Sequence, residues 1–153
     1  MRATPGRLGI AAYAAPGLAM AVPTIPVAVL LPAWYANDLG LGVAAVGAAL
    51  AAARTLDFIA DPLAGALSDR LRWRGGRRKP LIAIGGLLAG VALWAVTHPP
   101  ATVTAFHLFG WSLLLFVGWS LVAVPHAAWA ADFDDAQLRT TLVGAREAAM
   151  LLG

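Results

Sequence analysis

The chain contains no cysteine, and charged residues make up only 12% of its 153 residues. The absence of cysteine excludes a disulfide framework and a thiolate metal site. An ordinary globular domain is roughly 25% charged, whereas 60% of this chain is hydrophobic. Too few polar side chains are present to cover a water-soluble core. The composition therefore predicts a protein whose solvent is the hydrocarbon of a membrane.

Sequence signatures of enzymes are also absent. The chain has no HExxH, GxSxG or CxxC motif and no phosphate-binding glycine loop. Gly75 and Gly76 lie in a basic turn, without the strand and helix that such a loop requires. We therefore expect neither an enzymatic activity nor a cofactor.

The basic residues are concentrated in one place. Although the net charge is +3, six of the eleven basic residues lie between Arg70 and Lys79, flanked by apolar stretches. This pattern is typical of a cytoplasmic membrane loop and argues against a nucleic-acid partner.

Apolar stretches long enough to cross a bilayer, about 20 residues each, separate the charged clusters. Their approximate ranges are 8–35, 41–67, 80–97 and 103–131, with a further span starting at 142. Polar loops are expected at 68–79 and 132–141. Several prolines in the first span should bend or loosen it, which membranes tolerate when neighbouring helices satisfy the freed carbonyls. The predicted fold class is an all-α membrane protein.

The distribution of lysine and arginine predicts the orientation of these spans. Arg2, Arg7, the cluster at 70–79 and Arg139 all fall on one side of the layout. Because cytoplasmic loops carry an excess of basic residues, that side is expected to be cytoplasmic. We expect a multi-pass protein of the cell (inner or plasma) membrane with its N-terminus in the cytoplasm.

Three charged residues interrupt the second span: Arg54, Asp57 and Asp61. An ionisable group at mid-membrane costs at least about 2.5 to 3.5 kcal/mol, so such groups are usually functional. Their spacing places all three on one helix face. The two carboxylates are candidates for binding Na⁺ or a proton, because either would remove excess negative charge. Alternatively, Arg54 and Asp57 form a structural ion pair and Asp61 caps a helix break at Pro62.

Four segments together resemble a known family. They are YANDLG at 35–40, RTLDFIADPLAGALSDR at 54–70, GRRKP at 76–80 and VPHAAW at 124–129. In this order they resemble the first, second and fourth helices and the intervening loop of the glycoside-pentoside-hexuronide:cation symporters, the melibiose-permease-like branch of the major facilitator superfamily. The resemblance covers nearly the whole chain.

This resemblance implies a twelve-helix protein made of two six-helix halves that rock around a central site. The chain would supply the first four helices and the start of the fifth, and its partner would be the missing C-terminal half. The implied function is symport of a small solute, of the sugar or glycoside class, with Na⁺ or H⁺ by alternating access. A fragment of this length is expected to be inactive alone.

The resemblance also implies roles for individual residues. Asp57 and Asp61 would be the cation-binding carboxylates, and the ligands of the metal ion if Na⁺ is the coupling ion. Residues near the substrate or involved in coupling would be Arg54, Ser120 and Arg146. His126, beside Pro125, is either a substrate ligand or the partner of a freed carbonyl. The cytoplasmic loop motif would comprise Gly65, Asp69, Arg70, Gly76, Arg77 and Arg78.

The sequence departs from the family at the positions that bind galactosides. Galactoside-transporting members have an aspartate on the first and on the fourth helix. Here the first span has no acid between Arg7 and Asp38, and the fourth-helix position is Ala123. The resemblance therefore does not specify a substrate. A second function also stays open, namely a small membrane adaptor or assembly subunit whose buried charges pair with a partner helix.

Overall fold

The computed structural model describes residues 6–70 and 78–153 and is built from helices, with no β-strand in those ranges. In chain order the elements are α1 (Arg7–Ala21), the π-helical η1 (Pro26–Leu30), α2 (Leu31–Ala33), the π-helical η2 (Trp34–Asp38), α3 (Val43–Arg70), α4 (Lys79–Thr97), α5 (Ala105–Ala130) and α6 (Ala136–Leu152). Within the described ranges, four stretches are long and apolar enough to cross a membrane: Arg7–Asp38, α3, α4 and α5. The predicted all-α membrane fold class is confirmed.

The first of these stretches is not one regular helix. It is interrupted after Ala21 and continues through the π-helical segments η1 and η2. Pro23 and Pro26 lie at the interruption, and neither has the N–H group that an α-helical hydrogen bond needs. Between them, the Thr24 hydroxyl donates to the carbonyl of Met20 at 3.1 Å. The prolines therefore interrupt the first span near its middle.

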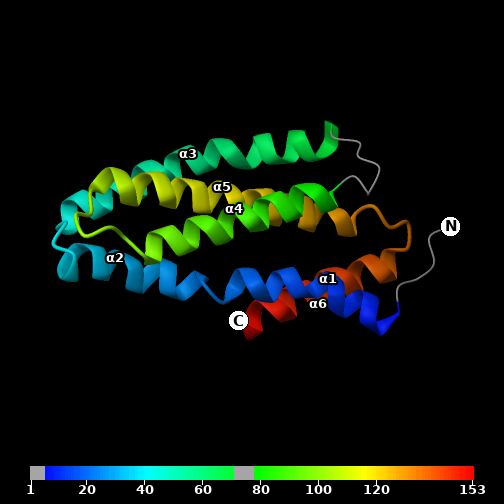
Figure 1. Cartoon of the computed structure of the whole chain (residues 1–153). Helices are drawn as coiled ribbons and strands as arrows, with labels where there is room; N and C mark the ends of the chain where they lie inside the picture. Colours follow the sequence, from blue (N-terminus) through cyan, green and yellow to red (C-terminus); the bar gives the residue numbers. More distant parts are fainter. Residues whose placement is uncertain (1–5, 71–77) are drawn as a thin grey trace. The chain divides into compact units, whose positions relative to one another are not determined.

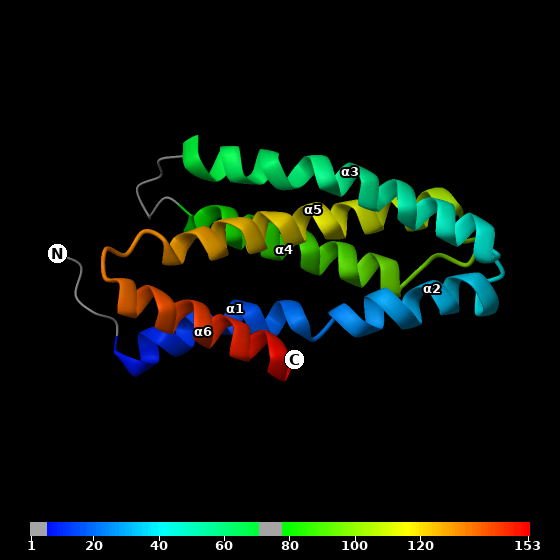
Figure 2. The same ribbon diagram turned by 180° about the vertical axis from the view of Figure 1, so that it is seen from behind.

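The described residues divide into two units, and the first is Ala28–His126. In this unit α3, α4 and α5 lie side by side in both views (Figures 1 and 2). α4 and α5 come closest where Gly85 faces Gly118, since a Cβ atom on Gly118 would lie only 2.6 Å from the backbone nitrogen of Ala89. Small residues allow this approach of two backbones, as is common between transmembrane helices.

A buried hydrogen bond joins the end of the first span to the end of α4. The Tyr35 hydroxyl donates to the carbonyl of Val96 at 2.7 Å, and Tyr35 is fully buried. In a continuing helix this carbonyl would accept from residue 100, which is a proline without an N–H. The tyrosine thus caps the C-terminal end of α4. Gly40 and Gly42, both at positive φ, then allow the tight turn into α3.

The second unit consists of Met1–Val27 and Ala127–Gly153, and its described residues form a pair of packed helices. α1 and α6 lie side by side in both views (Figures 1 and 2). Gly17 permits their close contact, because a Cβ atom there would lie 3.1 Å from the carbonyl oxygen of Arg146. Tyr13 and Leu142 are buried at this interface, and Trp129 packs edge-on against the Tyr13 ring at 5.7 Å.

The start of α6 differs from the sequence-based expectation. Residues 132–141 were expected to form a polar loop, but α6 begins at Ala136. The Asp135 side chain caps the helix by accepting from the backbone N–H groups of Gln137 and Leu138 at 2.8 and 3.3 Å. Four of the polar residues that suggested a loop, Gln137, Arg139, Thr140 and Thr141, are instead exposed side chains in the first turns of α6. Polarity along the sequence did not distinguish a loop from a capped, solvated helix end.

Candidate functional site

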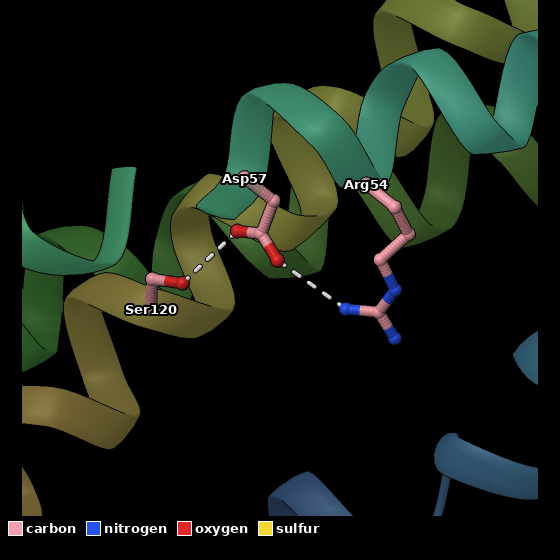
Figure 3. A network of polar contacts seen from close by, with 3 residues as sticks. All are labelled: Arg54, Asp57 and Ser120. Atoms are coloured by element: carbon pink, nitrogen blue, oxygen red, sulfur yellow. Dashed lines mark hydrogen bonds and ion pairs between the residues drawn. The ribbon is translucent and has the colours of Figure 1, made fainter. Parts of the chain in front are cut away.

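Asp57 is a buried carboxylate in the middle of an apolar helix. It lies on α3 and is only 8% exposed. Its Oδ1 atom accepts a hydrogen bond from Ser120 Oγ at 3.1 Å, and its Oδ2 atom faces Arg54 Nη1 at 3.3 Å (Figure 3). Both carboxylate oxygens are therefore engaged. The Ser120 contact also ties α3 to α5, although the two residues are 63 positions apart.

Helical geometry explains how the three residues meet. Arg54 and Asp57 are three positions apart on α3, a spacing that brings side chains together on one helix face. Ser120 reaches the same carboxylate from α5. A buried carboxylate is costly unless it is paired and hydrogen-bonded, and this arrangement supplies one ion pair and one hydroxyl donor.

The two contacts are long for their type. Hydroxyl donors normally lie about 2.5 to 3.0 Å from their acceptors, and N–H donors about 2.7 to 3.2 Å. The Ser120 contact of 3.1 Å and the Arg54 contact of 3.3 Å exceed these ranges. Asp57 is therefore partnered on both carboxylate oxygens by contacts near the upper limit of hydrogen-bond length.

The Arg54 side chain is the exposed part of the site. Its side chain is 67% exposed, compared with 11% for the side chain of Asp57. Its guanidinium carbon lies 4.1 Å from the centre of the Phe116 ring. The sequence analysis missed Phe116, although it precedes Ser120 by four positions and so shares its helix face. That spacing was the available signal once Ser120 was considered.

Asp61, the second predicted carboxylate, has a different environment. It lies one turn beyond Asp57 on α3, where its side chain is exposed. It makes no hydrogen bond or ion pair with another residue that the structure describes. In residues 6–70 and 78–153 there is also no group of three His, Cys, Asp or Glu side chains able to hold a metal ion. The oxygen donors gathered at the site are therefore the Asp57 carboxylate and the Ser120 hydroxyl.

The remaining substrate or coupling candidates are His126 and Arg146. His126 is fully buried on α5, directly after Pro125. Arg146 is on α6 in the other unit, where its Nη1 atom lies 3.1 Å from Glu147 Oε1. The structure therefore brings Arg54 and Ser120 to Asp57, and Arg146 is described within the other unit.

The predicted cytoplasmic loop motif is partly visible. Asp69 and Arg70 end α3, and Arg78 immediately precedes α4. Arg78 Nη2 lies 3.8 Å from Asp69 Oδ1, and the arginine side chain is only 8% exposed. Gly65 lies on α3 opposite Val124, at ordinary packing distance. The other two members of the motif, Gly76 and Arg77, lie outside the described residues.

Comparisons with known proteins agree on one family. The family model described as MFS/sugar transport protein matches residues 12–153. In Escherichia coli (strain K12), the inner membrane symporter YicJ is 30% identical over 99 residues, covering 62% of this chain and 21% of the relative. YagG, provisionally named a glycoside/cation symporter, is 29% identical over 102 residues, covering 65% and 22%. A glucuronide carrier protein homolog is 29% identical over 127 residues, covering 78% and 27%.

The matched regions thus span only about a quarter of the length of these relatives. No solved structure matches the chain.

Proposed function

We propose that this chain, which belongs to the family of MFS/sugar transport proteins, carries the cation-coupling site of a symporter. It is a multi-pass membrane protein, and its relatives are transporters. The observation that carries the proposal is the environment of Asp57. A buried carboxylate in an apolar helix, held by two long contacts on two helices, is a site that a small cation can enter and leave.

The coupling ion is Na⁺ or a proton. Hard cations prefer oxygen ligands, and Asp57 and Ser120 present a carboxylate and a hydroxyl. Na⁺ would need further oxygens, which backbone carbonyls, water or Asp61 would supply. A proton needs only the Asp57 carboxylate. In either case the bound cation would replace or add to Arg54 as the positive partner of the buried Asp57 carboxylate.

The proposed solute is a small sugar or glycoside. Support comes from the family description and from relatives named for glycoside and glucuronide transport. We assign transport to the full-length polypeptide that carries these residues, working by alternating access. His126 and Arg146 are proposed to face the solute. The contact between Arg78 and Asp69 is proposed to form in one state and break in the other, as an element with two arrangements.

Removing both carboxylates tests the proposal. In the full-length gene product, Asp57→Asn combined with Asp61→Asn should abolish uptake driven by a Na⁺ or proton gradient, by about 100-fold or more, because the cation loses its charged ligands. Uptake of labelled glycosides into proteoliposomes, with and without each gradient, measures this.

The matched control is Asp134→Asn, which removes an exposed carboxylate from the segment before α6 and should leave uptake near the wild-type rate. Gradient-driven uptake that survives the double substitution would contradict the proposal. Loss of association with a partner protein, with transport intact, would favour the adaptor alternative.

A further inference from the structure

Phe116 contacts the charged pair but carries no charge itself. It lies on α5, is 9% exposed, and its ring centre is 4.1 Å from the guanidinium carbon of Arg54. A guanidinium over an aromatic face within about 6 Å is attracted by the quadrupole of the ring. Helix α5 therefore contacts both members of the Arg54–Asp57 ion pair: Ser120 bonds Asp57, and Phe116 supports Arg54.

The two contacts of Arg54 are made in a single conformation. The same guanidinium lies 3.3 Å from Asp57 Oδ2 and over the Phe116 ring. Each contact therefore raises the population of the conformation that makes the other. Because most of the Arg54 side chain is exposed, conformers that make neither contact are the alternative.

Arg54 in this conformation competes with any other cation at Asp57. It occupies Oδ2, and its positive charge repels a second cation placed a few ångströms away. A cation that enters must displace Arg54 from Oδ2 or bind against that repulsion. The strength with which Arg54 is held thus sets the concentration of cation needed to fill the site.

We propose that Phe116 is a positioning residue that sets the affinity for the coupling cation by holding Arg54 against Asp57. This inference rests on the proposed function of Asp57 as the cation site. The aromatic face stabilises the conformation in which Arg54 competes with the cation for Asp57. The ring thereby keeps the affinity for the cation low enough for its release. Phe116 does not itself bind the transported ion.

Weakening the electrostatic attraction of the ring should therefore tighten cation binding. Complete loss of the contact corresponds to a decrease of about two- to thirty-fold in the half-saturating cation concentration. The maximal uptake rate should change much less. The effect should be absent when residue 54 has no charge.

A fluorinated series tests this with little change in side-chain size. Phe116 is replaced in the full-length gene product by mono-, di- and trifluorophenylalanine, which progressively weaken the negative face of the ring. The half-saturating concentration is measured for Na⁺ at fixed pH and for protons without Na⁺. It should fall stepwise along the series. Phe116→Trp, which strengthens the contact, should leave it unchanged or raise it.

Two controls separate positioning from packing. The same fluorinated series at Phe109, on the same helix and packed against Phe106, should leave cation affinity unchanged. In an Arg54→Gln background the series at Phe116 should have no effect. A purely structural role for Phe116 would instead lower the maximal rate and protein yield in both backgrounds.

A second measurement does not depend on transport. The rate at which a dicarbonyl reagent modifies Arg54, followed by mass spectrometry, should rise along the fluorinated series as the guanidinium is released. An unchanged modification rate, or cation affinity that stays constant or weakens along the series, would overturn the role of Phe116. Absence of any cation dependence in the wild-type protein, together with a rising modification rate, would overturn the proposed coupling function instead.

Discussion

A hydroxyl and a guanidinium approach the same buried carboxylate from different helices, and the two partners differ in exposure. Ser120 is buried on α5, while Arg54 is mostly exposed. A hydrogen bond to a charged group contributes about 1.5 to 3 kcal/mol. Ser120 is therefore a fixed partner of Asp57 in the packed interface of α3 and α5, and Arg54 is the partner with room to move away.

Ser120→Ala should lower the free energy of unfolding by about 1 to 3 kcal/mol, because Asp57 Oδ1 stays buried without its donor. Thermal unfolding in detergent measures the loss. The matched control is Ser112→Ala on the same helix, since the Ser112 hydroxyl is buried and has no hydrogen-bond partner among the described residues. Equal losses from the two substitutions would show that the contact with Asp57 contributes nothing specific.

Glycine and proline determine how the helical elements are shaped and packed. The first span is broken where Pro23 and Pro26 remove backbone donors. α4 and α5 pack closely where Gly85 and Gly118 leave no side chain between the backbones. The first effect acts within one element, and the second acts between two. Both depend on single residues that a hydropathy profile does not distinguish.

Gly118→Ala should destabilise the packing of α4 against α5 by about 1 to 3 kcal/mol, because the added methyl group would overlap the backbone of Ala89. Gly110→Ala is the matched control on α5, where nothing lies within 4 Å of the new atom. There the greater helix propensity of alanine should be neutral or stabilising by up to about 1 kcal/mol. Thermal unfolding of both variants measures the contrast. A Gly118→Ala protein as stable as Gly110→Ala would contradict the close packing described here.

At the scale of the whole molecule, the basic residues should determine which side of the membrane each turn occupies. Arg70 and Arg78 lie at the junction of α3 and α4, whereas the turn after α4 contains His98 and two prolines. The excess of positive charge at the first junction favours the cytoplasmic side. Two candidate spans, Arg7–Asp38 and α3, separate the N-terminus from that junction. Because two crossings return the chain to the same side, we propose that the N-terminus is also cytoplasmic.

These 153 residues contain no cysteine, so a single cysteine introduced among them can report on this orientation. Ala101→Cys, in the exposed turn after α4, should react with a membrane-impermeant maleimide added to intact cells. Arg70→Cys, at the exposed end of α3, should react only after the cells are opened. The reverse pattern would place the N-terminus outside.

Much of the architecture follows from the order of residues along the chain. The long apolar stretches predicted the all-α membrane fold, because hydrocarbon requires the backbone to satisfy its own hydrogen bonds. Helical spacing predicted that Arg54 and Asp57 would share a face, and the two are in contact. The start of α6 was missed, because a capped helix end and a loop have the same polar composition.

The sequence by itself determined the membrane character, the helical class and the position of three charges within the second span. Only the tertiary structure decided that Asp57 is buried between Ser120 and Arg54 while Asp61 is exposed. It also brought Phe116 to Arg54, 62 positions earlier in the chain. The physical reason is the distance along the chain over which each kind of interaction acts. Hydropathy and helical periodicity act over a few turns of one helix, whereas the partners of a buried charge are set by the packing of two helices that the sequence leaves far apart.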